Sequence, residues 1–156
     1  MVFRYQWIKE HTGVYNYASW DLGHNVIEPK IHSFVITQLK KEFGEKSWWS
    51  EGIPKNIPKS YSDARIDSGS NEPDWHFLNT IHYREIIDKN WSCLGDYFTP
   101  TGMEIVKKDK RLDWPVKPNA VRQRYSHPQR DIMTEEEHNF LSELAGWLTN
   151  KLCLMQ

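Results

Sequence analysis

The chain has 156 residues, a length typical of one domain that buries roughly 70% of the surface of its unfolded state. Hydrophobic residues make up only 38% of the sequence, but aromatic residues reach 13% and include eight Trp, which supply bulk for a packed core. The 20 basic and 21 acidic residues give a net charge of −1, which excludes a general electrostatic attraction to nucleic acid and leaves only local patches.

Cysteine usage and hydropathy indicate the compartment. Cys93 and Cys153 lack the spacing of a disulfide framework, so we expect reduced, buried thiols. No apolar run approaches the length of about 18 residues that a membrane span needs. The start of the chain, Met1 to Arg4, does not have the pattern of a signal peptide. We therefore expect a soluble, cytoplasmic protein that does not contact a membrane.

The first 24 residues carry six aromatic side chains without a clear period, and Gly13 and Gly23 interrupt them. We expect residues 1–24 to form a short helix or loop, a lead segment that packs its aromatic side chains onto the body of the protein. Residues 25–156 are then expected to form one helical domain, so that the chain is a single domain overall.

The first long helix is predicted over about 25–43. Residues 25–28, Asn-Val-Ile-Glu, have the pattern of a capping box, and Gly44 supplies a stop signal. Pro29 falls in the first turn, where a proline removes few backbone hydrogen bonds. The apolar residues that follow recur at helical spacing, namely Ile27, Ile31, Phe34, Val35, Leu39 and Phe43.

The middle of the chain is predicted to be helical with a long loop. Pro54 and Pro58 confine their surroundings to turns and helix starts, with a short helix over about 54–66. Residues 67–73 are the most loop-like stretch, and a second long helix is predicted over about 80–98. No segment alternates apolar and polar residues as a half-buried strand does, so the sequence predicts an all-α fold.

The last third is less regular until its final helix. A helix is possible over about 103–112, and residues 114–118, with two prolines, are expected to break helical structure. The Thr134–Glu137 segment has the pattern of a capping box. A clean apolar stripe follows it and predicts a helix over about 135–153. His138 follows the run of Glu residues and is expected at the surface.

The most informative stretch is residues 121–128, in which Arg122 and His127 are five positions apart. We expect Asn119 to cap a short helix that carries Arg122 towards His127. Pro128 disfavours α-helical geometry at His127, which is therefore expected at or just past the end of that helix. A guanidinium can clamp a phosphate, and an imidazole can move a proton near neutral pH. Together they are the minimum needed to cleave RNA without a metal.

The order of these features resembles the HEPN superfamily. The resemblance covers about residues 25–152 and is carried by the following features in order: a helix ending in Gly, Trp48-Trp49, Ile53-Pro54, the 86–91 segment Ile-Ile-Asp-Lys-Asn-Trp, and Arg122 to Pro128. It is similar above all to the branch named after a eukaryotic RNA-surveillance endonuclease, in which such a domain accompanies a PIN nuclease.

The resemblance implies a four- to five-helix up-down bundle, with aromatic-rich loops, over residues 25–156. It also implies a homodimer in which the two Arg-x4-His motifs meet across the interface. Active members are metal-independent endoribonucleases, frequent in toxin–antitoxin and phage-defence systems. Arg122 and His127 match the catalytic Arg and His of the family. Gln123 is a supporting residue and falls where active members often have Asn or another polar residue.

Two interpretations of this pair follow. In the enzyme hypothesis, His127 takes the proton from a ribose 2′-OH, and Arg122 stabilises the charge that develops on the phosphorane. The products would be a 2′,3′-cyclic phosphate and a 5′-OH, with no metal and no cofactor. In the structural alternative, Arg122 forms a salt bridge to an acid such as Asp131 or Glu135, and His127 ends a helix before a proline.

Residues around the pair could bind RNA. Arg124, Arg130 and Lys117 could track a phosphate backbone, although a solvated basic face is the alternative. Tyr125 could stack on a base, or it could belong to the core.

Three functions remain open from the sequence. The first is a metal-independent endoribonuclease that acts on single-stranded RNA in defence or RNA surveillance. The second is a catalytically silent HEPN module that dimerises or docks RNA or a protein, such as an antitoxin or a larger multidomain partner. The third is a sensor domain that binds a nucleotide in the same cleft. His76 and His82 have no evident third ligand, so no metal site is predicted.

Overall fold

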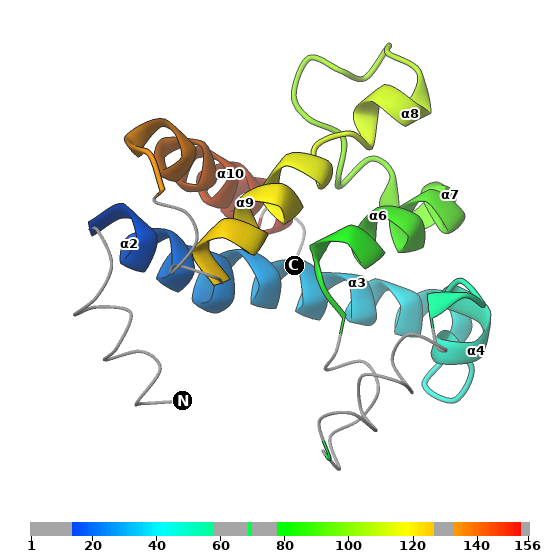
Figure 1. The fold of residues 1–156 in the computed structure, drawn as a ribbon. Coiled ribbons are helices and arrows are strands. Elements are labelled where there is room, and N and C mark those ends of the chain that lie inside the picture. Colours follow the sequence, from blue (N-terminus) through cyan, green and yellow to red (C-terminus); the bar gives the residue numbers. More distant parts are fainter. Residues whose placement is uncertain (1–13, 58–68, 70–77, 127–132, 154–156) are drawn as a thin grey trace. The chain divides into compact units, whose positions relative to one another are not determined.

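A computed structural model describes residues 14–57, 69, 78–126 and 133–153, and no strand occurs among them, so the predicted all-α fold class is confirmed. The elements in chain order are α2 (Val14–Leu22), the π-helix η1 (Gly23–Ile27), α3 (Glu28–Phe43), α4 (Trp48–Gly52), α6 (Thr80–Lys89), α7 (Trp91–Leu94), α8 (Lys108–Arg111), α9 (Val116–Ser126) and α10 (Glu135–Cys153) (Figure 1). The HEPN-like topology stays a prediction. None of the helices in the described ranges is long and apolar enough to cross a membrane.

The chain divides into two compact units. One consists of residues 1–31 and 117–156, and the other consists of residues 32–116. In the first unit, α10 packs against α2 and η1. The expected lead segment over 1–24, and a single domain overall, remain predictions.

The first long helix begins earlier than the sequence predicts. The elements α2, η1 and α3 form one continuous helical run, Val14 to Phe43, so the predicted start at Asn25 is wrong. Leu22 keeps α-helical dihedral angles. The side chain of Asn25 donates its Nδ2 hydrogen to Asp21 Oδ1, 2.7 Å away and one turn earlier, so it braces the helix surface instead of capping a new helix.

Pro29 is accommodated by the π-helical turn that precedes α3. Proline lacks an N–H, and its ring crowds the carbonyl one turn back. The backbone N–H of Glu28 donates to the carbonyl of Gly23, five residues earlier, which is the wider spacing of a π-helix. The helix thus continues past the proline and places His24 and Glu28 one turn apart on the same side.

The end of α3 agrees with the sequence. Gly44 adopts φ of +83°, and its N–H donates to the carbonyl of Lys40 over 2.8 Å. A left-handed glycine directly after the last turn is the usual helix stop, so the predicted end at residue 43 is confirmed.

The predicted helix over 80–98 is divided at Asn90. This buried residue leaves helical geometry, with φ of −106° and ψ of 36°. Its side-chain Nδ2 donates to the carbonyls of Ile86 and Gly52, at 2.8 and 2.7 Å. One side-chain amide thus satisfies two buried carbonyls and ties α4 to α6. These hydrogen bonds favour an interruption of the helix at Asn90 over its continuation.

Two weaker helix predictions have different outcomes. Over 103–112 only α8 is helical. Of the predicted helix over 54–66, Ile57 is helical and buried, and residues 58–66 lie outside the described part of the chain.

The expected break at residues 114–118 is confirmed at residues 114–115, which lie between α8 and α9, and is wrong for residues 116–118. Helix α9 begins at Val116, so Pro118 lies in its first turn and Asn119 lies inside the helix rather than at its cap. The first-turn N–H groups have no partner within the helix, so a proline there costs little.

The final helix agrees with its prediction at both ends. Its capping box is formed: the Thr134 N–H donates to Glu137 Oε2 over 2.9 Å, and the Glu137 N–H donates to Thr134 Oγ1 over 3.2 Å. The apolar stripe of α10 is buried together with apolar residues of the same unit. These residues are Trp20, Ile27, Ile31, Val121, Met133, Leu141, Leu144, Ala145, Leu148 and Leu152.

Candidate functional site

Arg122, the predicted catalytic cation, lies on α9 and forms an ion pair with Glu28 of α3. Its Nε donates to Glu28 Oε1 over 2.6 Å, and the two side chains are 28% and 18% exposed. A structural salt bridge was the alternative expected for this residue, and among the described residues its partner is Glu28. The Arg122 side chain makes no other hydrogen bond to the described part of the chain.

Glu28 also faces a histidine on the π-helical turn. Its Oε2 lies 3.5 Å from His24 Nδ1, and the His24 side chain is 31% exposed. The imidazole packs against the Trp20 ring, with the ring centroids 5.1 Å apart. We call His24, Glu28 and Arg122 the His–Glu–Arg cluster. It joins an imidazole and a guanidinium through one carboxylate.

Four residues of the predicted site have side chains outside the described part of the structure. His127 and Arg130 lie outside the described residues. Gln123 and Tyr125 belong to α9, but their side chains are also outside the description. The pairing of Arg122 with His127 therefore stays a prediction, as do the roles of Gln123, Tyr125 and Arg130.

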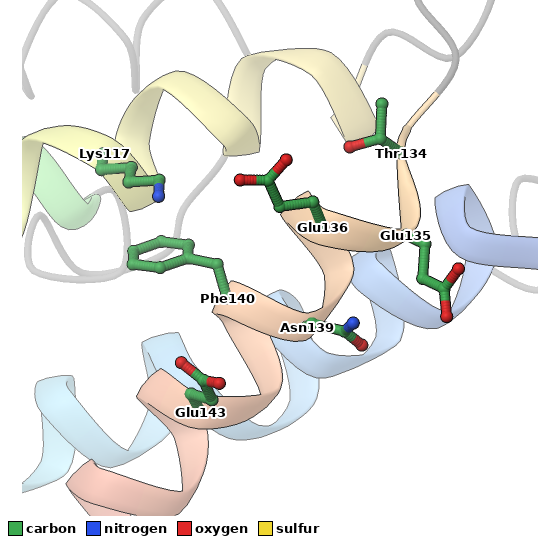
Figure 2. A pocket seen from close by; sticks show the side chains of 7 residues that line it. All are labelled: Lys117, Thr134, Glu135, Glu136, Asn139, Phe140 and Glu143. Atoms are coloured by element: carbon green, nitrogen blue, oxygen red, sulfur yellow. The ribbon is translucent and has the colours of Figure 1, made fainter.

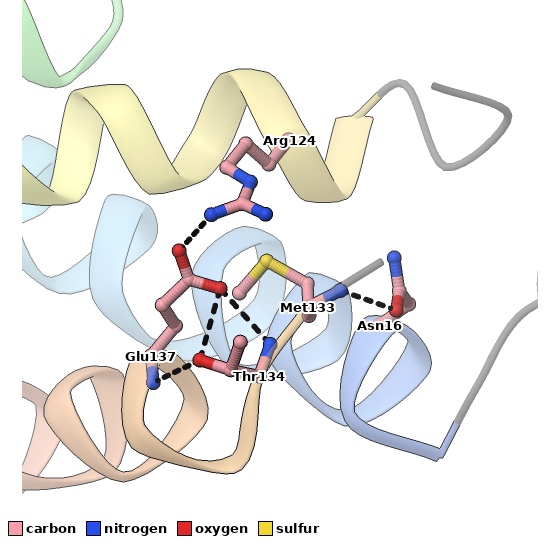
Figure 3. A network of polar contacts seen from close by, with 5 residues as sticks. All are labelled: Asn16, Arg124, Met133, Thr134 and Glu137. Atoms are coloured by element: carbon pink, nitrogen blue, oxygen red, sulfur yellow. Dashed lines mark hydrogen bonds and ion pairs between the residues drawn. The ribbon is translucent and has the colours of Figure 1, made fainter. Parts of the chain in front are cut away.

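Arg124 does not project as an unpaired cation. Its Nη1 forms an ion pair with Glu137 Oε1, and the same Glu137 closes the capping box of α10 (Figure 3). Directly before the box, the buried N–H of Met133 donates to Asn16 Oδ1 over 2.9 Å. Arg124 therefore links α9 to the first turn of α10.

Lys117 lies on an aromatic ring beside an acidic hollow. Its Nζ is 4.1 Å from the centroid of the Phe140 ring, a cation–π contact that Figure 2 shows on the wall of the hollow. The hollow has a volume of about 580 Å³ and is lined by Lys117, Thr134, Glu135, Glu136, Asn139, Phe140 and Glu143. Three carboxylates against one ammonium favour a cation there rather than a phosphate.

His138 is not the surface residue expected from the sequence. It is half-buried, its Nδ1 lies 3.1 Å from the Oγ of the buried Ser19, and its ring lies 5.8 Å from that of Tyr15. The position is set by the packing of α10 against α2, which turns this side of the first α10 turn inward.

Outside this cluster, the described residues do not form a metal-binding group. No group of three or more His, Cys, Asp or Glu side chains that could hold a metal occurs among the described residues. Cys93 is a half-buried free thiol. Burial raises its pKa above the ordinary thiol value, and the negative charge of Glu42 adds to the rise, so little reactive thiolate is present near neutral pH.

The sequence interpretation missed His24 and Glu28. Residues four apart on a helix are neighbours on its surface, so this spacing could have identified the pair. The predicted helix start at Asn25 separated them, and Glu28 was assigned to a capping box. The approach of Arg122, 94 positions away from Glu28, had no local signal.

No protein-family model matches the chain, and neither the curated proteins nor the solved structures contain a significant match.

Proposed function

We propose that the protein is a HEPN-type, metal-independent endoribonuclease that cleaves single-stranded RNA through attack by the ribose 2′-OH. Arg122 stabilises the charge on the phosphorane, and His127 accepts the 2′-OH proton. The proposed setting is cytoplasmic, in phage defence, a toxin–antitoxin pair or RNA surveillance. The proposed assembly is a homodimer.

The observation that carries the proposal is the way Arg122 is held. Glu28 anchors the guanidinium at Nε, and the Arg122 side chain is 28% exposed. A guanidinium is planar, so anchoring one edge fixes the direction of its two Nη groups. Oriented Nη donors can bind two phosphate oxygens in parallel, and a pre-oriented charge needs no rearrangement when the transition state forms.

The test is cleavage of single-stranded RNA by the purified chain in EDTA. We expect 2′,3′-cyclic phosphate ends, and we expect DNA to stay intact because it lacks the attacking hydroxyl. His127→Ala should lower the cleavage rate by about two to four orders of magnitude, the usual weight of general acid–base catalysis. Arg122→Lys should keep a cation next to Glu28 but lose the two Nη donors that bind a phosphate in parallel. We expect the cleavage rate to fall by about two to three orders of magnitude.

Circular dichroism of each variant separates catalysis from folding. Arg122→Lys should retain the helical spectrum because the ion pair with Glu28 can re-form. Absence of cleavage by the wild type on every RNA tested, or full activity of His127→Ala, would sink the enzyme proposal.

A second candidate is the catalytically silent helical module, and the neighbours of Arg122 favour it. Arg124 is paired with Glu137, and Lys117 is seated on Phe140 at the rim of an acidic hollow. These two cations are therefore held by partners of the same chain and do not form a track for an RNA backbone. In that case the wild type should be inactive on RNA, and Arg122→Ala should lower the unfolding midpoint, because Glu28 loses the guanidinium that pairs with it.

A further inference from the structure

Cleavage of RNA by its own 2′-OH needs two proton transfers. One group removes the proton of the 2′-OH, and a second group protonates the 5′-oxygen as the P–O5′ bond breaks. The proposed function assigns the first transfer to His127. Arg122 is permanently charged and cannot exchange a proton, so within one chain the second transfer needs a residue other than Arg122 and His127.

The His–Glu–Arg cluster contains a second imidazole. His24 is joined to Arg122 through the two oxygens of Glu28, at 3.5 Å from Oε2 to His24 Nδ1 and 2.6 Å from Oε1 to Arg122 Nε. The side chains of His24 and Arg122 are 31% and 28% exposed, so solvent or a ligand can reach both ends of the cluster. A carboxylate that contacts one ring nitrogen sets the tautomer and orientation of an imidazole.

The backbone at His24 supports the same assignment. His24 lies on the single π-helical turn of an otherwise α-helical run from Val14 to Phe43. The hydrogen bonds of a π-helical turn have poorer geometry than those of an α-helix, and such turns are frequently found at functional sites. Here the turn directly precedes α3 with its Pro29, and it places His24 beside Glu28, the carboxylate that holds Arg122.

We propose that His24 is the general acid of the reaction, with Glu28 as its positioning residue. This inference rests on the proposed endoribonuclease function and adds a residue to it. His127 accepts the 2′-OH proton as the 2′-oxygen bonds to phosphorus. The P–O5′ bond breaks with its electron pair on the 5′-oxygen, and the imidazolium of His24 donates a proton to that oxygen. The products are a 2′,3′-cyclic phosphate and a 5′-OH, and exchange with water restores both imidazoles.

The deciding experiment compares two RNA substrates in EDTA. One is ordinary RNA, and the other carries sulfur in place of the 5′-bridging oxygen at the cleavage position. A thiol has a pKa of about 8.5, so the sulfur leaves as a thiolate and needs no general acid. His24→Ala should lower the rate on ordinary RNA by about 10²- to 10⁴-fold and cleave the sulfur substrate within a few-fold of the wild type.

His127→Ala is the matched control, because the residue proposed as the base should be needed for both substrates. Glu28→Gln should lower both rates, since Arg122 also loses its anchor, and it should lower the ordinary-RNA rate more. A merely structural role for Glu28 would leave the ratio of the two rates unchanged. His24→Gln, with circular dichroism of both His24 variants, guards against a folding defect.

The outcomes separate this inference from the function on which it depends. A wild type that cleaves neither substrate overturns both. An active wild type with a fully active His24→Ala variant, or with equal losses on the two substrates, overturns the role of His24 alone. Loss of helical structure in both His24→Ala and His24→Gln would make His24 a structural residue and would also overturn it.

Discussion

At the scale of single residues, Arg122 can serve the fold and the proposed site together. Its Nε–Glu28 contact ties α9 to the start of α3, and the pair is partly exposed. Ion pairs of this exposure contribute about 1 kcal/mol or less to stability. That is small beside the several kcal/mol of transition-state stabilisation that a placed cation can supply, so variants of Arg122 should affect activity more than folding.

Two glycines allow a matched test of backbone conformation. Gly44 ends α3 at φ of +83°, where a Cβ is strained, so Gly44→Ala should destabilise the protein by about 1–2 kcal/mol. Gly146 lies inside α10, and a Cβ there would meet nothing within 4 Å. Gly146→Ala should therefore stabilise the protein by about 0.5–1 kcal/mol. Urea unfolding measures both, and equal effects of the two changes would contradict the role of Gly44 as a helix stop.

At the scale of elements, the start of α10 combines a cap with an ion pair. Glu137 accepts from the Thr134 N–H and pairs with Arg124 of α9. The same carboxylate thus satisfies a backbone donor at a helix start and holds a neighbouring helix. This explains why the boundary predicted from a local capping pattern agrees with the structure.

Thr134→Ala removes the side-chain half of this capping box. We expect a loss of about 1 kcal/mol in the free energy of unfolding, measured by urea titration. Ser142→Ala, an exposed change in the interior of the same helix, is the control and should stay within about 0.5 kcal/mol. A Thr134→Ala variant as stable as this control would show that the cap contributes nothing.

At the scale of the whole molecule, we predict a homodimer. Each chain contributes one Arg-x4-His motif, and a two-fold axis can bring two copies of a patch together. Light scattering at tens of micromolar should report twice the mass of the 18.6 kDa chain. A strict monomer would contradict a composite site and would shift the balance to the silent-module alternative.

The sequence by itself determined the features that have local causes. The all-α class, the stop at Gly44, and the capping box and bounds of α10 each follow from short-range periodicity, one glycine or four adjacent residues. The Arg-x4-His motif was also visible, although only Arg122 of that pair lies in the described part of the chain.

Only the tertiary structure decided the features that depend on partners distant in sequence. The helix continues through Asn25, although the local capping pattern predicts a helix start there. In this region α2 and η1 pack against α10. Asn90 interrupts its helix because its amide reaches Gly52, 38 positions away. Glu28 meets Arg122 across 94 positions. Such contacts form when buried polar groups and charges find partners in the folded chain, and no local pattern encodes which residues meet.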